Sequence, residues 1–398
     1  MYNVRMKHNF DTLPFNDDSQ CLSDDVHTSD AETPTQTAFF DSALEALNAA
    51  APMGSTVRAV GFDHADMFLR AGYRVLEGEA DVAIARGGER EFDEARKFPC
   101  KKLILVPTHA YAAVATPRYR TQDKSFAVMR EGAKPFAAVF DKTDVHSNLA
   151  SLFGEIAALD LAAFDVTFGA RMRGERADRE LTQEIAALVS GLTAELKQLE
   201  KDRASQANAL IAAGKKTARI IERRPELLHA SGASQAAEAL RMLYAAEDRA
   251  IGMRGETEML IAPYITDFYI KSLTSNKPEF PPDNNKRIDS ICEYFGVDVR
   301  RACVYTTAIY PPIKMRLFEY RRDEFRAELL RMLSELNSRQ SAAWHVFKRL
   351  YHDDGYGLKT LVDKTDIGLC VALAPDVFAV DSMLSFLKQT GRLEKYIV

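Results

Sequence analysis

The sequence predicts an α/β fold with a parallel sheet in its N-terminal part, followed by an all-helical C-terminal part. The first observation is the stretch 81–108, in which an apolar run, a Gly87-Gly88 turn, a charged helical segment and a second apolar run follow one another. Strand, glycine turn, helix and strand in this order are typical of a right-handed parallel crossover. The second observation is a change of pattern at His146, after which apolar residues recur mainly at helical spacing.

Composition sets the class of protein. The 398 residues are enough for roughly two to three domains, and 46% hydrophobic residues are enough to build real cores. No apolar run approaches the roughly 20 residues that span a bilayer, and the N-terminus has no apolar signal segment. We therefore expect a cytoplasmic protein that does not contact membranes. The five cysteines are scattered and form no Cys-x-x-Cys pair, which indicates neither a disulfide framework nor a zinc cluster.

The negative charge is concentrated at the N-terminus. Residues 1–36 carry seven acidic and two basic residues, a charge of −5 that equals the formal charge of the whole chain. The remaining residues are neutral overall, and a neutral body does not provide the basic surface that nucleic-acid binding requires. We predict that residues 1–36 are a disordered acidic extension. A docking arm for a partner is the functional alternative.

The α/β part is predicted to span residues 37–145. Its first elements are a helix over Phe39–Ala50, a strand over Val57–Phe62, a helix capped by Asp63 that ends at Ala71, and a strand over Tyr73–Leu76. Only four residues separate this last strand from the strand that begins at Asp81, whereas a parallel crossover needs about ten or more. Either a helix is missing here, or the strand Tyr73–Leu76 pairs with a different neighbour.

The central crossover continues with a charged helix over Glu89–Phe98 and a strand over Leu103–Val106, and one further buried strand follows at Phe136–Phe140. A glycine turn that opens a helix can cradle a phosphate, because the first helical amides have no internal partner. Glu89 and Glu91 would compete with a phosphate for the same amides. A plain reversal of the chain is therefore the alternative interpretation of the turn.

The helical part is predicted to span residues 146–398, with chain breaks at Gly174, Gly214, Pro225, Pro311-Pro312 and Gly355 and across 277–285. The predicted helices are 147–168, 177–213, 234–249, 255–273, 285–295, 319–352 and 376–390. The long helix carries leucine and isoleucine residues at alternating spacings of three and four. They are Leu181, Ile185, Leu188, Leu192, Leu196 and Leu199. This stripe indicates either the buried face of a domain helix or a coiled-coil surface.

Several short motifs appear in an order that resembles a known superfamily. They are Gly87-Gly88 with Asp93 five residues later, Val106-Pro107-Thr108, Ala115-Thr116-Pro117, and Asp141-Lys142-Thr143-Asp144. Over about 57–273 the chain resembles the iron-containing alcohol dehydrogenase superfamily, most closely glycerol-1-phosphate dehydrogenases and more distantly 3-dehydroquinate synthases. The resemblance implies a Rossmann-like domain followed by a helical domain, the dehydroquinate synthase-like fold.

The resemblance also implies a nucleotide and a substrate. NAD(P) would be bound by Gly87, Gly88, Asp93 and Thr108, and substrate would be contacted by His109 and Lys134. Glu89 stands where the family has a third glycine, and it would bring a side chain and a negative charge to the pyrophosphate. The family's Ser-His-Asp-Gly stretch reads His109–Ala113 here, without the aspartate. These departures argue against ordinary nucleotide binding.

The family's metal ligands are replaced as well. The family holds zinc or iron with one carboxylate, which aligns with Glu155, and two histidines. The first histidine helix reads Ser231–Ala239 and contains no histidine, and the family's His-Gly-Glu step reads Arg254-Gly255-Glu256. A zinc site normally needs three protein ligands, so we predict no metal. Instead, Arg254 would supply the positive charge and pair with Glu155 or Glu238.

The resemblance places four candidate catalytic residues in an interdomain cleft, namely Glu155, His229, Arg254 and Glu256. The first hypothesis is a dehydrogenase-like enzyme without the usual metal, acting on a small anionic substrate in this cleft. The second is a catalytically dead homologue that serves as a binding or regulatory module. The third is an intact dehydrogenase, or a 3-dehydroquinate synthase-like lyase, in which a shifted alignment hides His229 or His146 as metal ligands. We also expect a homo-oligomer or a pairing with a related subunit.

Overall fold

The computed structural model describes most of the chain. The described residues are 36–108, 114, 118–123, 126–142, 148–249, 252–275, 283–298, 315–354, 363–378 and 380–394. Apart from Gln36, the predicted acidic extension lies outside these residues. The predicted boundary between 37–145 and 146–398 stays a prediction.

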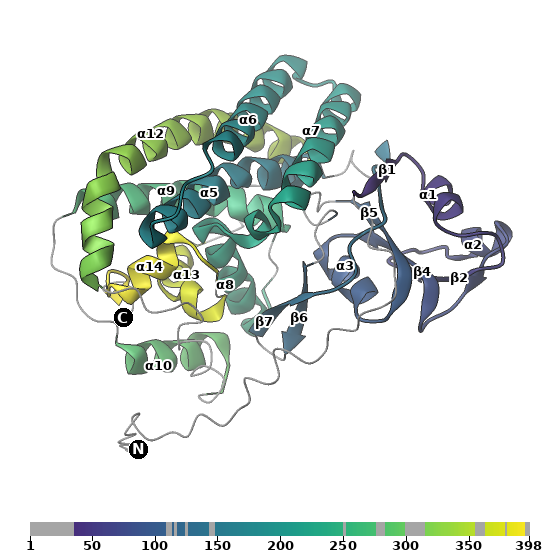
Figure 1. Cartoon of the computed structure of the whole chain (residues 1–398), viewed down its shortest axis with the longest axis horizontal. Coiled ribbons are helices and arrows are strands. Elements are labelled where there is room, and N and C mark those ends of the chain that lie inside the picture. The colour runs from purple at the N-terminus through teal and green to yellow at the C-terminus, as the bar shows by residue number, and fades with distance from the viewer. Residues whose placement is uncertain are drawn as a thin grey trace.

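A six-stranded sheet forms one end of the molecule, and the helical part forms the other (Figure 1). The strand order is β1-β8-β5-β4-β2-β3, and every neighbouring pair is parallel. This confirms the predicted parallel α/β fold followed by helices. The strands are β1 (Ala38–Phe40), β2 (Thr56–Val60), β3 (Arg74–Val75), β4 (Ala80–Gly87), β5 (Cys100–Pro107) and β8 (Ala137–Val139).

The predicted central crossover is confirmed. β4 leads through Gly88 into α3 (Glu89–Arg96), and β5 returns parallel to β4 with Ile84 opposite Ile104. The middle of both strands is fully buried and consists of alanine, valine, isoleucine and leucine. This is expected for a parallel sheet covered on both faces. The crossover therefore brings the glycine turn to the edge of the sheet where the strands end.

The short connection before β4 has a simple geometric explanation. β3 pairs with β2 and not with β4, so Val57 of β2 lies between Val75 on one side and Val82 on the other. Because β3 is only two residues long, the chain has little distance to travel back before it enters β4. The alternative in which this strand pairs with a different neighbour is therefore correct.

The start of the α/β part differs from the prediction. Residues 38–40, predicted as the first turn of a helix, form the edge strand β1, and α1 covers only Ala43–Ala50. The ring of Phe39 packs edge-on against Phe140, which follows β8, with the ring centroids 5.3 Å apart. This tertiary contact favours the strand over the helical spacing. The predicted cap at Asp63 is also wrong, because α2 (Asp66–Arg70) begins after Ala65.

An antiparallel hairpin was not predicted. β6 (Arg118–Asp123) and β7 (Phe126–Glu131) pair in register as a separate two-stranded sheet. β6 lies beside α3, and the hairpin reaches toward the helical part (Figure 1). β8 then returns to the main sheet, where it pairs with β1 and β5.

Most predicted helices are confirmed, with small shifts of their ends. Gly174 ends the first of them in a left-handed conformation (φ 80°), as the sequence predicts. These helices are α5 (Leu149–Arg173), α8 (Gly232–Ala246), α9 (Arg254–Thr274), α10 (Asn284–Phe295) and α12 (Met315–Asp353).

The predicted helix 177–213 is wrong as a single element. It forms two helices, α6 (Arg179–Leu199) and α7 (Arg203–Arg223), separated by Glu200, which adopts a positive φ of 41°. Asp202 caps α7 by accepting a hydrogen bond from the amide of Ser205 (3.1 Å). The predicted break at Gly214 falls inside α7, where the glycine is buried. Pro225 instead opens a short 3-10 helix, η4 (Pro225–His229).

The C-terminal segment 376–390 is also two helices rather than one. α13 (Lys364–Val377) starts twelve residues before the predicted position, and α14 (Met383–Gln389) follows a break. Asp363 caps α13 through the amide of Thr365 (2.8 Å). Pro375 lies in the last turn of α13, and the helix continues past it to Val377.

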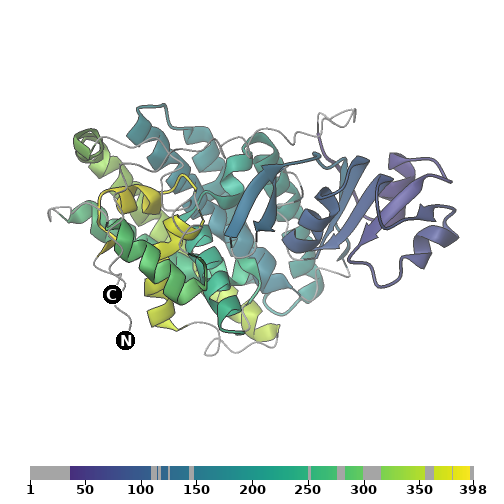
Figure 2. The same cartoon turned by 90° about the horizontal axis from the view of Figure 1, so that it is seen from below.

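The cores connect the two parts of the molecule. One buried cluster joins the α3 face of the sheet to α5, α6, α7 and α12, and a second lies among α8, α9, α10, α13 and α14. Leu181, Ile185, Leu192 and Leu196 are buried in the first cluster, which confirms the buried-stripe interpretation. Figure 2 shows the sheet and the helices as neighbouring lobes from a second direction. None of the helices that the structure describes is long and apolar enough to cross a membrane.

Candidate functional site

The glycine turn between β4 and α3 is closed by a side chain of its own helix. The amide of Gly88, the residue directly before α3, donates to Oε2 of Glu91 (2.9 Å). Gly87 adopts a φ of 144°, and a Cβ at this position would lie 2.5 Å from the same carboxylate oxygen. The carboxylate of Glu91 therefore occupies the place at a helix start where a phosphate would otherwise bind.

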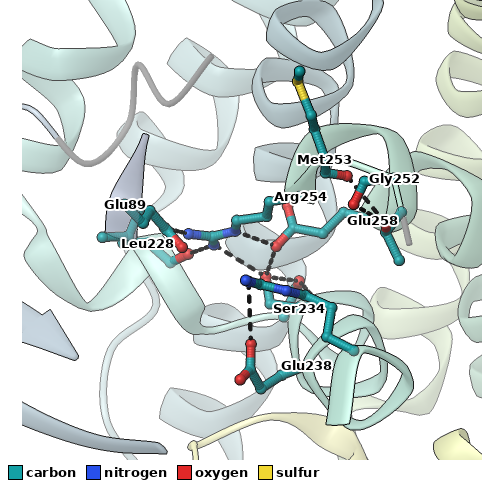
Figure 3. Close-up of polar contacts among 11 residues, drawn as sticks. Glu89, Leu228, Ser234, Glu238, Gly252, Met253, Arg254 and Glu258 are labelled. Carbon is teal, nitrogen blue, oxygen red and sulfur yellow. Dashed lines mark hydrogen bonds and ion pairs between the residues drawn. The ribbon is translucent and has the colours of Figure 1, made fainter. Parts of the chain in front are cut away.

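The first residue of α3 contacts the helical part. Glu89 forms an ion pair with Nη1 of Arg254, the first residue of α9 (Figure 3). The side chain of Arg254 is 12% exposed and that of Glu89 is 14% exposed. The ion pair thus joins the N-terminus of α3 to the N-terminus of α9, across the junction of the two parts.

The guanidinium of Arg254 is surrounded by acceptors. Its Nε lies 2.7 Å from Oε1 of Glu258, one turn further along α9, and its Nη2 donates to the carbonyl of Leu228. Ser234, near the start of α8, lies 3.5 Å from Nη2 and donates to Glu258 at 2.6 Å. Figure 3 shows Glu89 and Leu228 on one side of the guanidinium and Glu258 on the other. All three nitrogens of the guanidinium are engaged.

A close crossing of two helices positions this network. Gly154 of α5 and Gly255 of α9 pack backbone against backbone, and a Cβ at Gly255 would lie 1.9 Å from the carbonyl oxygen of Ser151. Glycine is the residue that permits such an approach. The crossing brings Glu155, the neighbour of Gly154, close enough for its charge to act on Arg254.

The electrostatics of Arg254 favour its charged form. Burial alone would lower the pKa of the guanidinium, but the negative charges of Glu258, Glu89 and Glu155 outweigh it and raise the pKa above its ordinary value. Three acidic residues therefore surround one permanent cation. Because the cation is covalently part of the chain, the residues present do not fit a divalent metal ion at this position.

Glu256 lies two residues after Arg254 but serves a different contact. Its carboxylate caps α9 by accepting a hydrogen bond from the amide of Met253 (3.1 Å). Burial, together with the negative charge of Asp354, raises the pKa of Glu256 to about 7, against the lowering effect of the Met253 amide. The residue is 4% exposed. It therefore holds a proton near neutral pH at the junction of α9 with the neighbouring helices.

The predicted nucleotide and substrate residues are only partly brought together. The amide of Thr108 donates to the carbonyl of Gly87 (2.8 Å), so Thr108 lies at the glycine turn. Asp93 is buried in α3. Lys134 instead forms an ion pair with Glu222 at the end of α7 (3.0 Å). His109 lies outside the described residues.

The predicted partners of Arg254 are half right. Glu155 interacts with it through charge, whereas Glu238 forms an ion pair with Arg241 on its own helix (3.5 Å), and Arg254 uses Glu89 and Glu258 instead. Among the described residues, the hydrogen-bond partners of Arg254 do not include Glu238.

Of the two histidines considered as alternative metal ligands, the structure describes only His229. His229 ends η4, and its ring packs edge-on against Phe378 at 5.5 Å. His146 lies outside the part of the chain that the structure describes. Within that part, no group of three or more histidine, cysteine, aspartate or glutamate side chains could hold a metal ion. The predicted lack of a metal stays a prediction.

Two members of the network were not predicted. Glu258 lies four residues after Arg254, a spacing at which opposite charges on a helix meet, and this signal was present in the sequence. Ser234 lies in the segment that the resemblance aligns with the family's first histidine helix. No sequence motif identified this serine as a contact of Arg254. Glu89 was expected only to hinder a nucleotide, and the structure adds its pairing with Arg254.

A second candidate site lies where the parallel strands end. A pocket of about 300 Å³, which we call the edge pocket, is formed by the ends of β2, β4, β5 and β8 and by the start of α1. Ligands of open α/β sheets bind at this edge. Ser42, the residue before α1, makes no capping hydrogen bond with its side chain, so the first amides of α1 are not satisfied by it. The lining residues are Ser42, Ala43, Phe62, Asp63, His64, Met67, Arg86, Val106, Val139 and Asp141.

Comparisons with known proteins give only distant likenesses. No family model and no curated protein matches the chain. Maleylacetate reductase from Agrobacterium tumefaciens is similar at 12% identity and a TM-score of 0.48, covering 91% of this chain and 97% of the other. An alcohol dehydrogenase from an archaeal halo-thermophile of a Red Sea brine pool is similar at 11% identity and a TM-score of 0.48, covering 92% and 97%.

A third solved structure is the iron-containing alcohol dehydrogenase from Thermotoga maritima. It is 11% identical, with a TM-score of 0.45, and the match covers 79% of this chain and 99% of the other.

Proposed function

We propose that this chain is a dehydrogenase-like protein that binds a small hydroxylated anion without metal-dependent hydride transfer, and that it serves as a binding or regulatory module. The observation that carries the proposal is the guanidinium of Arg254, which is held by Glu89, Glu258, Leu228 and Ser234 at the junction of the two parts. A permanent cation with all three nitrogens engaged leaves no place for a metal-bound substrate.

The glycine turn supports the same proposal. Nucleotide binding at such a turn depends on free backbone amides and on space next to the glycines. Here Glu91 accepts the hydrogen bond of the Gly88 amide and fills the space beside Gly87. A pyrophosphate would have to displace a carboxylate and overcome the charge of Glu89. NAD(P) is therefore a poor fit to these residues, although the sequence resemblance implies it.

The edge pocket offers the binding site. Arg86 and His64 can bind an acidic group, and the N-terminal amides of α1 favour negative charge at the same place. Asp63 and Asp141 can accept hydrogen bonds from hydroxyl groups. The pocket volume of about 300 Å³ suits a molecule of a few carbons with one acidic group. A polyol phosphate has this chemistry.

Thermal unfolding of protein purified without a chelator tests the proposal. We expect Zn²⁺, Fe²⁺, NADH and NADPH to leave the Tm unchanged, and sn-glycerol 1-phosphate to raise it, because a ligand at about 100 times its Kd stabilises by about 2.7 kcal/mol. Arg86→Gln should abolish the rise, and Arg70→Gln, which changes an exposed arginine of α2, should not. One equivalent of zinc or iron that is lost only on unfolding, or stabilisation by NADH, would contradict the proposal.

A second candidate is an enzyme that acts without a metal on a small anionic substrate at the junction. The observation that favours it is Glu256, a buried carboxyl whose pKa of about 7 suits proton transfer at neutral pH. The test is oxidation of sn-glycerol 1-phosphate by NAD⁺ in the presence of EDTA. Turnover that survives EDTA and disappears in Glu256→Gln would favour this candidate over the binding module.

A further inference from the structure

A groove between α6 and α12 is formed by one face of each helix, far along the chain from the glycine turn. Its volume is about 470 Å³, within the roughly 300–1,000 Å³ of pockets that hold small organic molecules. α6 and α12 pack against each other (Figure 1). The lining residues are Ser190, Thr193, Ala194 and Lys197 from α6, and Arg339, Ala342, His345, Val346 and Arg349 from α12.

The lining is positively charged and contains no acidic residue. Lys197 makes no ion pair within the part of the chain that the structure describes. Arg349 donates its Nη2 to the carbonyl of Leu196, while its Nε is buried without a hydrogen-bond partner among the described residues. A buried donor without an acceptor is unfavourable. An anion placed between Lys197 and Arg349 would be attracted by both positive charges.

Two acidic residues close to the groove are paired with arginines. Arg339 holds Asp160 through two hydrogen bonds of 2.7 and 2.9 Å. Glu335, in the neighbouring cavity, is paired with Arg331 at 2.7 Å. Neither of these two carboxylates pairs with Lys197 or Arg349.

The middle of the groove is apolar and made of small residues. Ala194 and Ala342 leave the space between the helices open, and Val346 is buried below them. The hydroxyl of Thr193 donates to the carbonyl of Val189 (2.7 Å), so its proton is directed into its own helix. A ligand therefore meets Lys197 and Arg349, the small side chains of Ala194 and Ala342, and Arg339, which is paired with Asp160.

We propose that this groove binds a phosphate monoester that carries a short apolar tail. The phosphate lies between Lys197 and Arg349, and the tail lies over Ala194 and Ala342. A phosphate monoester carries a charge of about −1.5 to −2 at pH 7, which matches two cations better than a single carboxylate does. The site is independent of the proposed function, because it shares no residue with the edge pocket or with the network of Arg254.

Isothermal titration of the full chain with octyl phosphate, below its micellar concentration, tests the proposal. We expect octyl phosphate to bind, inorganic phosphate to bind more weakly, and octyl glucoside not to bind. Lys197→Ala should weaken octyl phosphate about tenfold, because a hydrogen bond to a charged group is lost. Lys216→Ala removes the same charge from an exposed position of α7 and should have no effect.

A second variant keeps the charges and blocks the space. Ala194 is exposed, so Ala194→Phe should fold normally and should abolish binding of octyl phosphate by filling the groove. Unchanged binding in both Lys197→Ala and Ala194→Phe would overturn the proposal. So would association with phosphatidate vesicles in the absence of any binding of octyl phosphate, since a groove of this volume is sized for one small molecule. Trp344, the only tryptophan of the chain, precedes His345 and gives a local fluorescence signal.

Discussion

Glu89 and Arg254 lie 165 residues apart in the chain and form an ion pair between the first residues of two helices, α3 and α9. One helix belongs to the crossover of the parallel sheet and the other to the helical part. Both side chains are largely buried, and Glu258 and Glu155 add further negative charge around the same guanidinium. A single cation therefore serves several carboxylates where the two parts meet.

Replacing this cation should destabilise the protein strongly. In Arg254→Met the buried carboxylates of Glu89 and Glu258 lose their partner, and breaking one side of a buried ion pair typically costs about 3–5 kcal/mol. We expect this loss in the free energy of unfolding measured with urea. The matched control is Arg331→Met, which breaks an exposed pair with Glu335 and should cost about 0–1 kcal/mol. Equal losses in the two variants would show that the network contributes no more than a surface pair.

Removing the carboxylate from the glycine turn should open it. Glu91→Ala frees the amide of Gly88 and the space beside Gly87. We expect inorganic phosphate and NADH to bind the variant more tightly than the wild type, with NADH binding followed by its fluorescence. The variant should also lose about 0.5–2 kcal/mol of stability, because α3 loses a cap. Glu94→Ala, which changes a half-exposed acid of the same helix, is the control, and identical NADH binding in all three proteins would refute the explanation.

The ionisation of Glu256 should make the free energy of unfolding depend on pH. Its pKa is about 7 in the folded protein and 4.5 ordinarily, so between these values the folded state holds a proton that the unfolded chain has released. Its contribution is therefore fully present below pH 4.5 and is lost as the pH rises through about 7. Glu256→Gln keeps an oxygen for the Met253 amide and should flatten the fall in unfolding free energy between pH 5 and 8. Glu195→Gln, on the surface of α6, should leave the slope unchanged.

The crossing of α5 and α9 should tolerate only glycine. A Cβ at Gly255 would lie 1.9 Å from the carbonyl oxygen of Ser151, so Gly255→Ala must push the two helices apart. We expect a clear fall in Tm and a weaker contact between Glu89 and Arg254. Gly191→Ala on α6 meets nothing within 4 Å and should raise stability by up to about 1 kcal/mol, because alanine favours helix. A Tm that is equal in the two variants would contradict the close crossing.

Sequence reasoning was most successful where one physical rule decides the outcome. The glycine turn between two apolar runs predicted the crossover of β4, α3 and β5, and helical spacing predicted most of the later helices. It failed where a tertiary contact decides. Phe39 lies in an edge strand because its ring packs on Phe140, and the spacing of apolar residues does not reveal this.

The candidate site was predicted in part for the same reason. The sequence resemblance aligns Arg254 with a histidine of the family, and the charge of Arg254 requires acidic partners nearby. Which acids these are depends on the crossing of Gly154 with Gly255 and on the position of α3, neither of which follows from residue spacing. Glu89 was therefore assigned a repulsive role only, and Glu238 was considered as a partner in place of Glu258.

The guanidinium of Arg254 also has a consequence for assembly in the cell. A positive charge encoded in the gene arrives with every newly made copy, in a fixed ratio of one per chain. Unlike a metal ion, this charge needs no uptake into the cell and no loading into the protein, and a chelator cannot remove it. The balance of charge where the sheet meets the helices is thus complete as soon as the polypeptide has folded, whatever the supply of trace elements.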